Sequence, residues 1–144
     1  MPTTVILCLV TVADADVLTN PTLAETFRAN WDMQDTDLTF RSIEEDKAIA
    51  AAGGGSSDMG NICHIMPGIH PAFKIETKFG NHHPGFTEFA GKPQNFAVAR
   101  VAAKALAGTS IDMLSVDGLV DEAKAAFEEQ KASWTMWEPN YVQQ

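Results

Sequence analysis

The chain has 144 residues, of which 45% are hydrophobic, and it carries a net charge of −9 with 10 lysine and arginine residues. This length suits one domain with a sizeable core, and the apolar content excludes a disordered chain. The shortage of basic residues argues against nucleic acid or an anionic membrane as a partner. The composition therefore indicates an acidic globular domain and says little about its function.

The apolar run from Val5 to Val12 predicts a strand that is covered on both faces. It is much shorter than the roughly 20 residues that cross a bilayer. No lysine or arginine precedes it, so it lacks the basic start of a secretory signal. Cys8 in this run and the distant Cys63 lack the spacing of a metal or redox motif. We expect both to be buried free thiols, which fits a reducing, cytoplasmic compartment.

The dipeptide Asn20-Pro21 predicts the start of a helix. Asparagine favours the N-cap, and proline favours the first helical position. Apolar residues then recur every four positions and form one face of the helix. These residues are Leu23, Phe27 and Trp31.

The chain after Pro93 predicts two further helices. In the first, apolar residues follow the i, i+3, i+4, i+7, i+8 pattern of a helix face, and its alanines would let a neighbouring sheet or helix approach closely. In the last helix one apolar stripe faces the core. The apolar positions are Val98, Val101, Ala102, Ala105 and Leu106 in the first helix, and Leu119, Ala123 and Phe127 in the last.

Two more segments, Leu38–Ile43 and Ala72–Glu76, have the composition or alternation of short strands. With the strand at Val5–Val12, the order of strands and helices predicts an α/β fold. The strands are few and the helices lie late in the chain. We therefore expect a partial three-layer arrangement, in which this sheet is one part of a larger sheet.

Two motifs suggest a functional site. The glycine-rich stretch Gly53–Asp58 ends on a carboxylate, and the turn Gly80–Phe86 carries a pair of histidines. Glycines let backbone N–H groups approach a substrate carboxylate closely, although a plain mobile loop would have the same composition. A turn that presents an imidazole at the end of a strand is a common way to build a metal ligand. Together the motifs indicate part of a hydrolytic metal site.

Five short segments, in order, resemble the C-terminal end of the aminoacylase/carboxypeptidase family of di-zinc amidohydrolases. Within it they are most similar to the aminobenzoyl-glutamate hydrolases and the β-alanyl-lysine type dipeptidases. The resemblance covers Asn20 to Gln130. The segments are Asn20–Ala24, Gly55–Asn61, Met66–Pro71, Asn81-His82 and Ala103–Ala107.

The resemblance implies a division of the chain into three parts. Residues 1–19 would form a strand and connection from the junction of the lid and catalytic domains. Residues 20–133 would be the C-terminal part of the catalytic domain, and residues 134–144 an aromatic tail. Members of this family are much longer than this chain, and a smaller lid domain that mediates dimerisation interrupts their catalytic domain.

The resemblance also implies a metal site and a substrate site. In the family, two zinc or other divalent ions are held by an early His-x-Asp, a glutamate pair, a further acid or histidine, and one late histidine. Two such ions share a bridging water and lower its pKa. The late histidine matches His82, and Gly55, Ser56 and His70 would lie near the substrate.

This chain contains no His-x-Asp, and its Glu44-Glu45 pair lies where the resemblance has no catalytic pair. Because zinc sites take three or four protein ligands, the chain alone should not be active. We expect it to be part of an enzyme that hydrolyses the amide bond of small N-acyl amino acids or dipeptides. The remaining part of that enzyme, or a partner chain, would supply the other ligands, and the assembly would be an oligomer.

Two alternatives remain open. The missing ligands and the aromatic tail from Trp134 to Tyr141 also suit a degenerate, non-catalytic relative that acts as a structural or interaction subunit. A third possibility is a small stand-alone domain in which His82, His70 and Asp58 bind a single metal ion.

Overall fold

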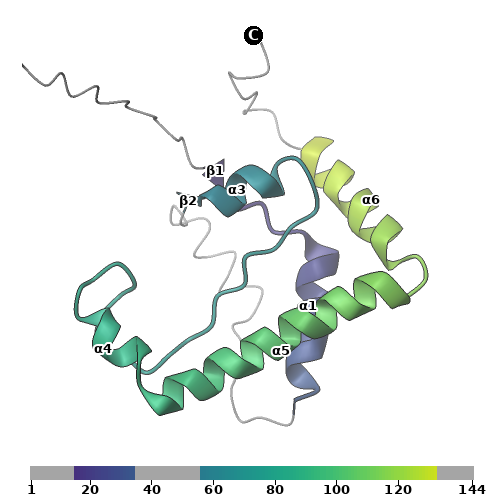
Figure 1. The fold of residues 1–144 in the computed structure, drawn as a ribbon. Helices are drawn as coiled ribbons and strands as arrows, with labels where there is room; N and C mark the ends of the chain where they lie inside the picture. The colour runs from purple at the N-terminus through teal and green to yellow at the C-terminus, as the bar shows by residue number, and fades with distance from the viewer. Residues whose placement is uncertain (1–14, 35–55, 133–144) are drawn as a thin grey trace, which may run out of the picture.

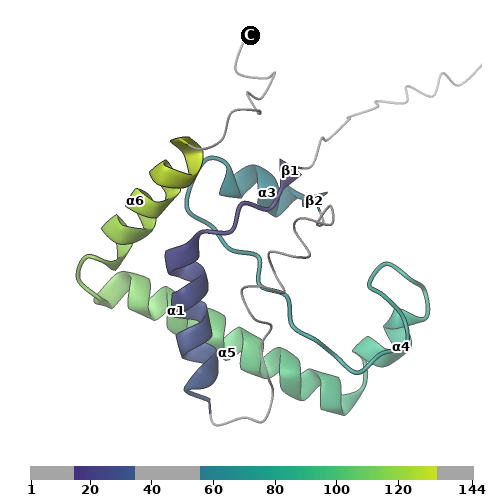
Figure 2. The ribbon, with the colours of Figure 1, turned by 180° about the vertical axis from the view of Figure 1, so that it is seen from behind.

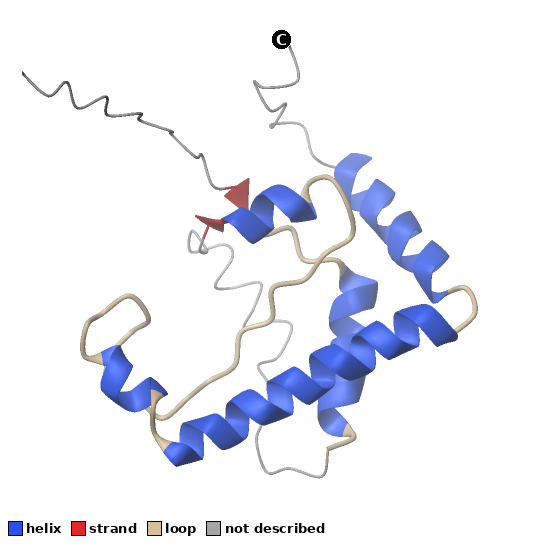
Figure 3. Ribbon diagram, in the orientation of Figure 1, coloured by secondary structure: helices blue, strands red, loops and turns tan. Residues whose placement is uncertain are grey.

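The computed structural model describes residues 15–34 and 56–132, and these residues are mainly helical (Figure 3). No helix in these two ranges is both long and apolar enough to cross a membrane. The elements in chain order are β1 (Ala15–Asp16), α1 (Pro21–Asp32), β2 (Ser56–Ser57), α3 (Asp58–Cys63), α4 (Phe86–Ala90), α5 (Pro93–Ser115) and α6 (Leu119–Ala132).

Helix α1 begins where the sequence predicts it. The side-chain oxygen of Asn20 accepts a hydrogen bond from the Leu23 N–H at 3.1 Å, and Pro21 takes the first helical position. Leu23, Phe27 and Trp31 are all buried, which confirms the predicted apolar face. The two aromatic rings lie 6.1 Å apart between centroids and form the centre of the core.

The long helix α5 crosses α1, and the main hydrophobic core lies where they meet (Figures 1 and 2). Gly108 permits this close approach, because a Cβ there would overlap the side-chain amide of Asn30 on α1. That amide donates a hydrogen bond to the carboxylate of Asp112, one turn further along α5. The predicted stripe on α5 is buried in its larger part, but Leu106 is 41% exposed. The core consists of Phe27, Trp31, Val98, Ala102 and Ala105, with Val101 and Ile69 packed against it.

Helix α6 follows a turn at Gly118, whose φ of 82° lies in the left-handed region that glycine tolerates best. Ala123 and Phe127 are buried, as predicted for the last helix. The Asn20 side chain donates a hydrogen bond to the carbonyl of Ala123 at 2.9 Å. This single buried asparagine therefore caps α1 and ties it to α6.

The predicted α/β fold is wrong for the described residues. Their only sheet is one antiparallel pair, in which β1 and β2 contribute two residues each (Figure 3). Ala72–Glu76 is not a strand, because the Glu76 backbone bonds to the side chain of Asn95 instead of to a neighbouring strand. The predicted strands Val5–Val12 and Leu38–Ile43 lie outside the described residues.

Candidate functional site

The connection between α3 and α4 carries the predicted site histidines, and two buried asparagines fix it to the helices. Asn20 donates its backbone N–H to the carbonyl of Gly68 at 2.9 Å. The Asn95 side chain accepts from the Glu76 N–H at 2.9 Å and donates to the Glu76 carbonyl at 3.0 Å. These asparagines are 0% and 3% exposed, so water competes little for their hydrogen bonds. The connection is thereby held in place although it is neither helix nor strand.

His70, near the start of this connection, lies against Ser57 of β2. The Oγ atom of Ser57 is 3.3 Å from Nδ1 of His70, which is within hydrogen-bond distance. Strand β2 positions Ser57, and Ile69 beside His70 packs against the core of α1 and α5. His70 is exposed and Ser57 is half-buried. The pair presents a hydroxyl and an imidazole that can bind a small polar molecule.

The sequence analysis named Ser56, and the structure instead places its neighbour Ser57 against His70. The backbone of Ser56 pairs with Asp16 in the short sheet. The sequence carries no signal that separates these two adjacent serines, because the contact between Ser57 and His70 depends on how the connection folds back to β2. Gly55, the other predicted substrate residue, lies outside the described residues.

His82 lies in the exposed turn before α4 and has a φ of 68°. This left-handed conformation is uncommon for a residue with a side chain. The turn is closed by the His83 N–H, which donates to the Gly80 carbonyl at 3.2 Å. Nδ1 of His83 accepts a hydrogen bond from the Gly85 N–H at 3.0 Å, and its ring stacks on Phe79 with 4.4 Å between centroids. His83 thus stabilises the turn and leaves the imidazole of His82 exposed.

Gly85 is needed for the ring stack in this turn. A Cβ at Gly85 would stand 2.7 Å from the ring of Phe79, which would displace that ring. Phe79 also meets Phe89 of α4 in an edge contact with 5.9 Å between centroids, and the Lys92 ammonium lies 3.9 Å from the centroid of the Phe89 ring. These contacts form an aromatic cluster that supports the turn that carries His82.

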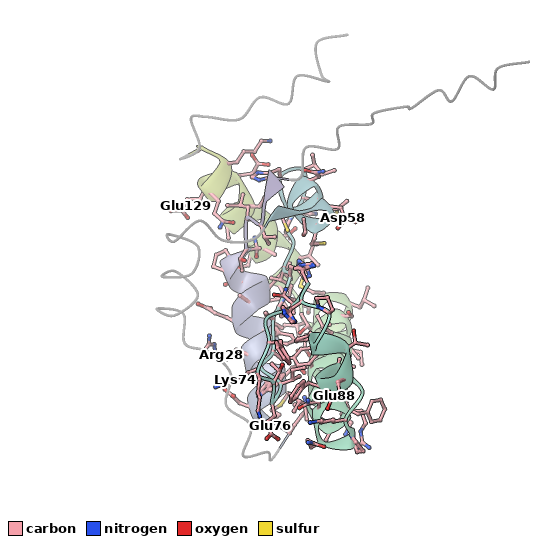
Figure 4. The ribbon with its side chains drawn as sticks, turned by 90° about the vertical axis from the view of Figure 1, so that its left-hand side faces the viewer. Arg28, Asp58, Lys74, Glu76, Glu88 and Glu129 are labelled. Carbon is pink, nitrogen blue, oxygen red and sulfur yellow. The ribbon has the colours of Figure 1, made fainter. Side chains whose placement is uncertain are left out.

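The described residues do not make a complete metal site. Within 15–34 and 56–132, no three or more His, Cys, Asp or Glu side chains are grouped so that they could hold a metal ion. Figure 4 shows Asp58 and Glu129 toward one end of the molecule, and Glu76 and Glu88 toward the other. The prediction of a stand-alone metal site made by His82, His70 and Asp58 is therefore wrong.

The two candidate groups also lie in different parts of the molecule. Ser57 and His70 are at β2, next to α3, whereas the His82 turn leads directly into α4. Figures 1 and 2 both show α3 and α4 well apart. The structure brings Ser57 to His70, and it does not bring either of them to His82.

Cys63 is a fully buried free thiol, as predicted, whereas Cys8 lies outside the described residues. Gly68 packs directly on it, since a Cβ at Gly68 would stand 2.7 Å from the Cys63 sulfur. Burial raises the pKa of the Cys63 thiol, which keeps it protonated and poorly nucleophilic. We therefore assign Cys63 to packing beneath the connection that carries His70.

Known proteins resemble most of this chain. Mouse Xaa-Arg dipeptidase is 34% identical over 112 residues, which make up 78% of this chain and 25% of the mouse protein. The human Xaa-Arg dipeptidase is 31% identical over 120 residues, or 81% of this chain and 26% of the human protein. The chain is similar to mammalian dipeptidases. It spans about a quarter of the length of these relatives.

These names agree with the expected class of enzyme, a hydrolase of peptide or amide bonds. They do not point to the narrower subgroup of aminobenzoyl-glutamate hydrolases and β-alanyl-lysine dipeptidases. No protein-family profile matches the chain. No solved structure matches it either.

Proposed function

We propose that this chain is one part of a metal-dependent dipeptidase or related amidohydrolase, which cleaves the amide bond of a dipeptide or a small N-acyl amino acid. The supporting observation is the 34% identity to mouse Xaa-Arg dipeptidase over 112 residues. Because both mammalian relatives carry this name, dipeptides with a C-terminal arginine are the first substrates to test.

In this proposal the chain is active only together with the rest of such an enzyme. The chain corresponds to about a quarter of each relative. His82 contributes one exposed imidazole to a site whose other metal ligands come from the remaining part of the protein or from a partner chain. Zinc is the expected metal, since imidazole is among its preferred ligands. A metal held there would lower the pKa of a bound water.

The second role we propose is substrate binding by the group around β2. Ser57 and His70 can donate and accept hydrogen bonds at one polar end of a small dipeptide, because the two groups lie 3.3 Å apart. Gly55, which lies just before β2 in the chain, would add a backbone N–H donor to the substrate carboxylate, whereas the backbone of Ser56 pairs with Asp16. This group would fix the substrate, and it would not bind the metal.

The test uses a complex of this chain with mouse Xaa-Arg dipeptidase from which the matching quarter has been deleted, produced by co-expression. We expect the complex to contain metal and to hydrolyse an Xaa-Arg dipeptide. His82→Ala should lower the metal content measured by elemental mass spectrometry, whereas His70→Ala should raise KM and leave the metal content unchanged. Lys78→Ala, an exposed residue of the same connection, is the matched control.

A complex that assembles, holds no metal and hydrolyses no dipeptide would refute this function. It would favour the alternative of a non-catalytic relative that serves as a structural subunit. Loss of metal in the Lys78→Ala control to the same extent as in His82→Ala would refute the assignment of His82.

A further inference from the structure

The outer face of α5 is apolar and exposed. We define it by five residues that recur at intervals of seven, four, four and three positions, so that they lie along one side of the helix. Phe96 is 63% exposed, Ile111 62% and Leu114 90%, and both alanines between Phe96 and Ile111 are exposed. The five residues are Phe96, Ala103, Ala107, Ile111 and Leu114.

The opposite side of α5 is already buried. Val98, Ala102 and Ala105 pack against α1. A helix at the solvent-exposed surface of a globular protein usually has polar residues on the side opposite its buried stripe. On the outer side of α5 the charged residues are Arg100 and Lys104, whose long side chains can lie over apolar neighbours while their charged groups reach water. A helix that is apolar on two opposite sides is typical of the interior of a larger structure.

We propose that the outer face of α5 is the surface on which the rest of a dipeptidase-like polypeptide packs. The occupant is the part that corresponds to the three quarters of the mouse and human relatives that this chain does not match. This inference rests on the proposed function, and it adds the surface through which the two parts join.

The size and shape of the outer face fit this occupant. From Phe96 to Leu114 it runs for about 27 Å, close to the diameter of a small domain. Ala103 and Ala107 near its middle leave room for a neighbouring backbone to approach closely. A second copy of the chain fits less well, because two copies that each carry a net charge of −9 repel one another.

The experiment compares variants of the full chain, alone and in complex with mouse Xaa-Arg dipeptidase that lacks its matching quarter. Leu114→Asp and Ile111→Asp place a charge on the outer face. Met33→Asp is the matched control, because Met33 is a 73% exposed apolar residue at the end of α1. Circular dichroism and urea unfolding are measured on the isolated chain, and the Kd of the complex is measured by a pull-down titration.

We expect both outer-face variants to weaken the complex by at least about tenfold, as at the buried centre of an interface. Met33→Asp should change the Kd by less than about twofold, since Met33 lies at the end of α1 and does not belong to the outer face. In the isolated chain all three variants should keep the helix content, and the two outer-face variants should lower the urea midpoint no more than Met33→Asp does, because all three place an exposed aspartate near the C-terminus of a helix.

Three results would overturn the inference. A urea midpoint that falls clearly further for isolated Leu114→Asp than for isolated Met33→Asp would show that other residues of this chain cover the face. A dimer of the isolated chain that Leu114→Asp dissociates would make a second copy the occupant. A complex that tolerates both outer-face variants as well as it tolerates Met33→Asp would mean that the face stays exposed.

The same samples separate this inference from the proposed function. A complex that depends on Leu114 but hydrolyses no dipeptide would keep the interface and refute the enzymatic role. A complex that hydrolyses Xaa-Arg dipeptides and is insensitive to Leu114→Asp would keep the enzymatic role and refute the interface.

Discussion

Replacing Gly108 with alanine tests how closely α1 and α5 approach each other. A Cβ at this position would stand 2.6 Å from Cγ of Asn30, far inside contact distance. Asn30 is 8% exposed, and its side chain donates hydrogen bonds to the Thr26 carbonyl and the Asp112 carboxylate. Because two hydrogen bonds hold the Asn30 amide, it cannot move away from a new methyl group at position 108 without breaking at least one of them.

The expected change in stability follows from two opposing terms. Loss of a hydrogen bond to a carboxylate costs about 1.5–3 kcal/mol. Alanine inside a helix is favoured over glycine by about 1 kcal/mol. Gly108→Ala should therefore lower the free energy of unfolding by about 0.5–2 kcal/mol. With Asn30→Ala already present, the overlap with the amide is removed and the Cβ of residue 30 stays close, at 3.3 Å. In this background Gly108→Ala should raise the free energy of unfolding by less than the full helix-propensity gain of about 1 kcal/mol.

The assay is urea unfolding followed by far-UV circular dichroism for the parent chain, the two single variants and the double variant. The sign of the Gly108→Ala effect should reverse between the two backgrounds. If Gly108→Ala raises the free energy of unfolding equally in both, α1 and α5 do not approach at this glycine and the packing described for the core is wrong.

Three further predictions concern the asparagine, the turn and the thiol. Asn20→Ala should lower the free energy of unfolding by about 2–4 kcal/mol, because α1 loses its N-cap and the carbonyl of Ala123 loses its hydrogen-bond donor. A decrease of less than about 1 kcal/mol in urea unfolding would contradict this. Gly85→Ala should shift the NMR signals of the Phe79 ring, because the new Cβ would displace that ring. Gly80→Ala is the control and should leave these signals in place, because a Cβ at Gly80 meets open space. Equal shifts in the two variants would argue against the stack of Phe79 and His83. The thiol of Cys63 should react with iodoacetamide only after unfolding. Because its pKa is raised in the folded state, stability should fall as the pH rises above the ordinary thiol value, and this fall should be absent in Cys63→Ala.

Helices α1, α5 and α6 were predictable because their signals are local, whereas the short helices α3 and α4 were not predicted. Asn20 and Pro21 act within one turn of α1, and the spacing of Phe27 and Trp31 already shows which side is buried. No long-range contact is needed to recognise such a pattern. The same locality explains why the last helix and its stripe at Ala123 were predicted.

The sheet failed because a strand needs a partner that the sequence does not name. Ala72–Glu76 has suitable residues for a strand, but Asn95, about twenty positions later, bonds the backbone of Glu76. The periodic pattern on α5 also predicted a buried Leu106, which is 41% exposed. Periodicity identifies the apolar side of a helix, but it does not show whether other residues cover that side.

In the candidate site, too, the features set by local sequence were predictable and those set by long-range contacts were not. The turn at His82 was predicted from its residue types, and its left-handed φ and the stack of His83 on Phe79 depend on geometry that those types do not fix. The contact of Ser57 with His70 joins residues 13 positions apart and depends on the fold of the chain between them. The metal ligand set could not be derived at all, because the described residues contain no group of ligands that completes it.

The most direct test of the proposed role is to purify the protein from its source without a chelating step, identify every chain that copurifies, and measure both bound metal and hydrolysis of Xaa-Arg dipeptides. We expect metal and dipeptidase activity in a fraction that contains this chain together with the remaining part of a dipeptidase-like protein. We also expect the isolated chain to show neither. A purified assembly that contains this remaining part and has neither metal nor activity would contradict a catalytic role for this chain.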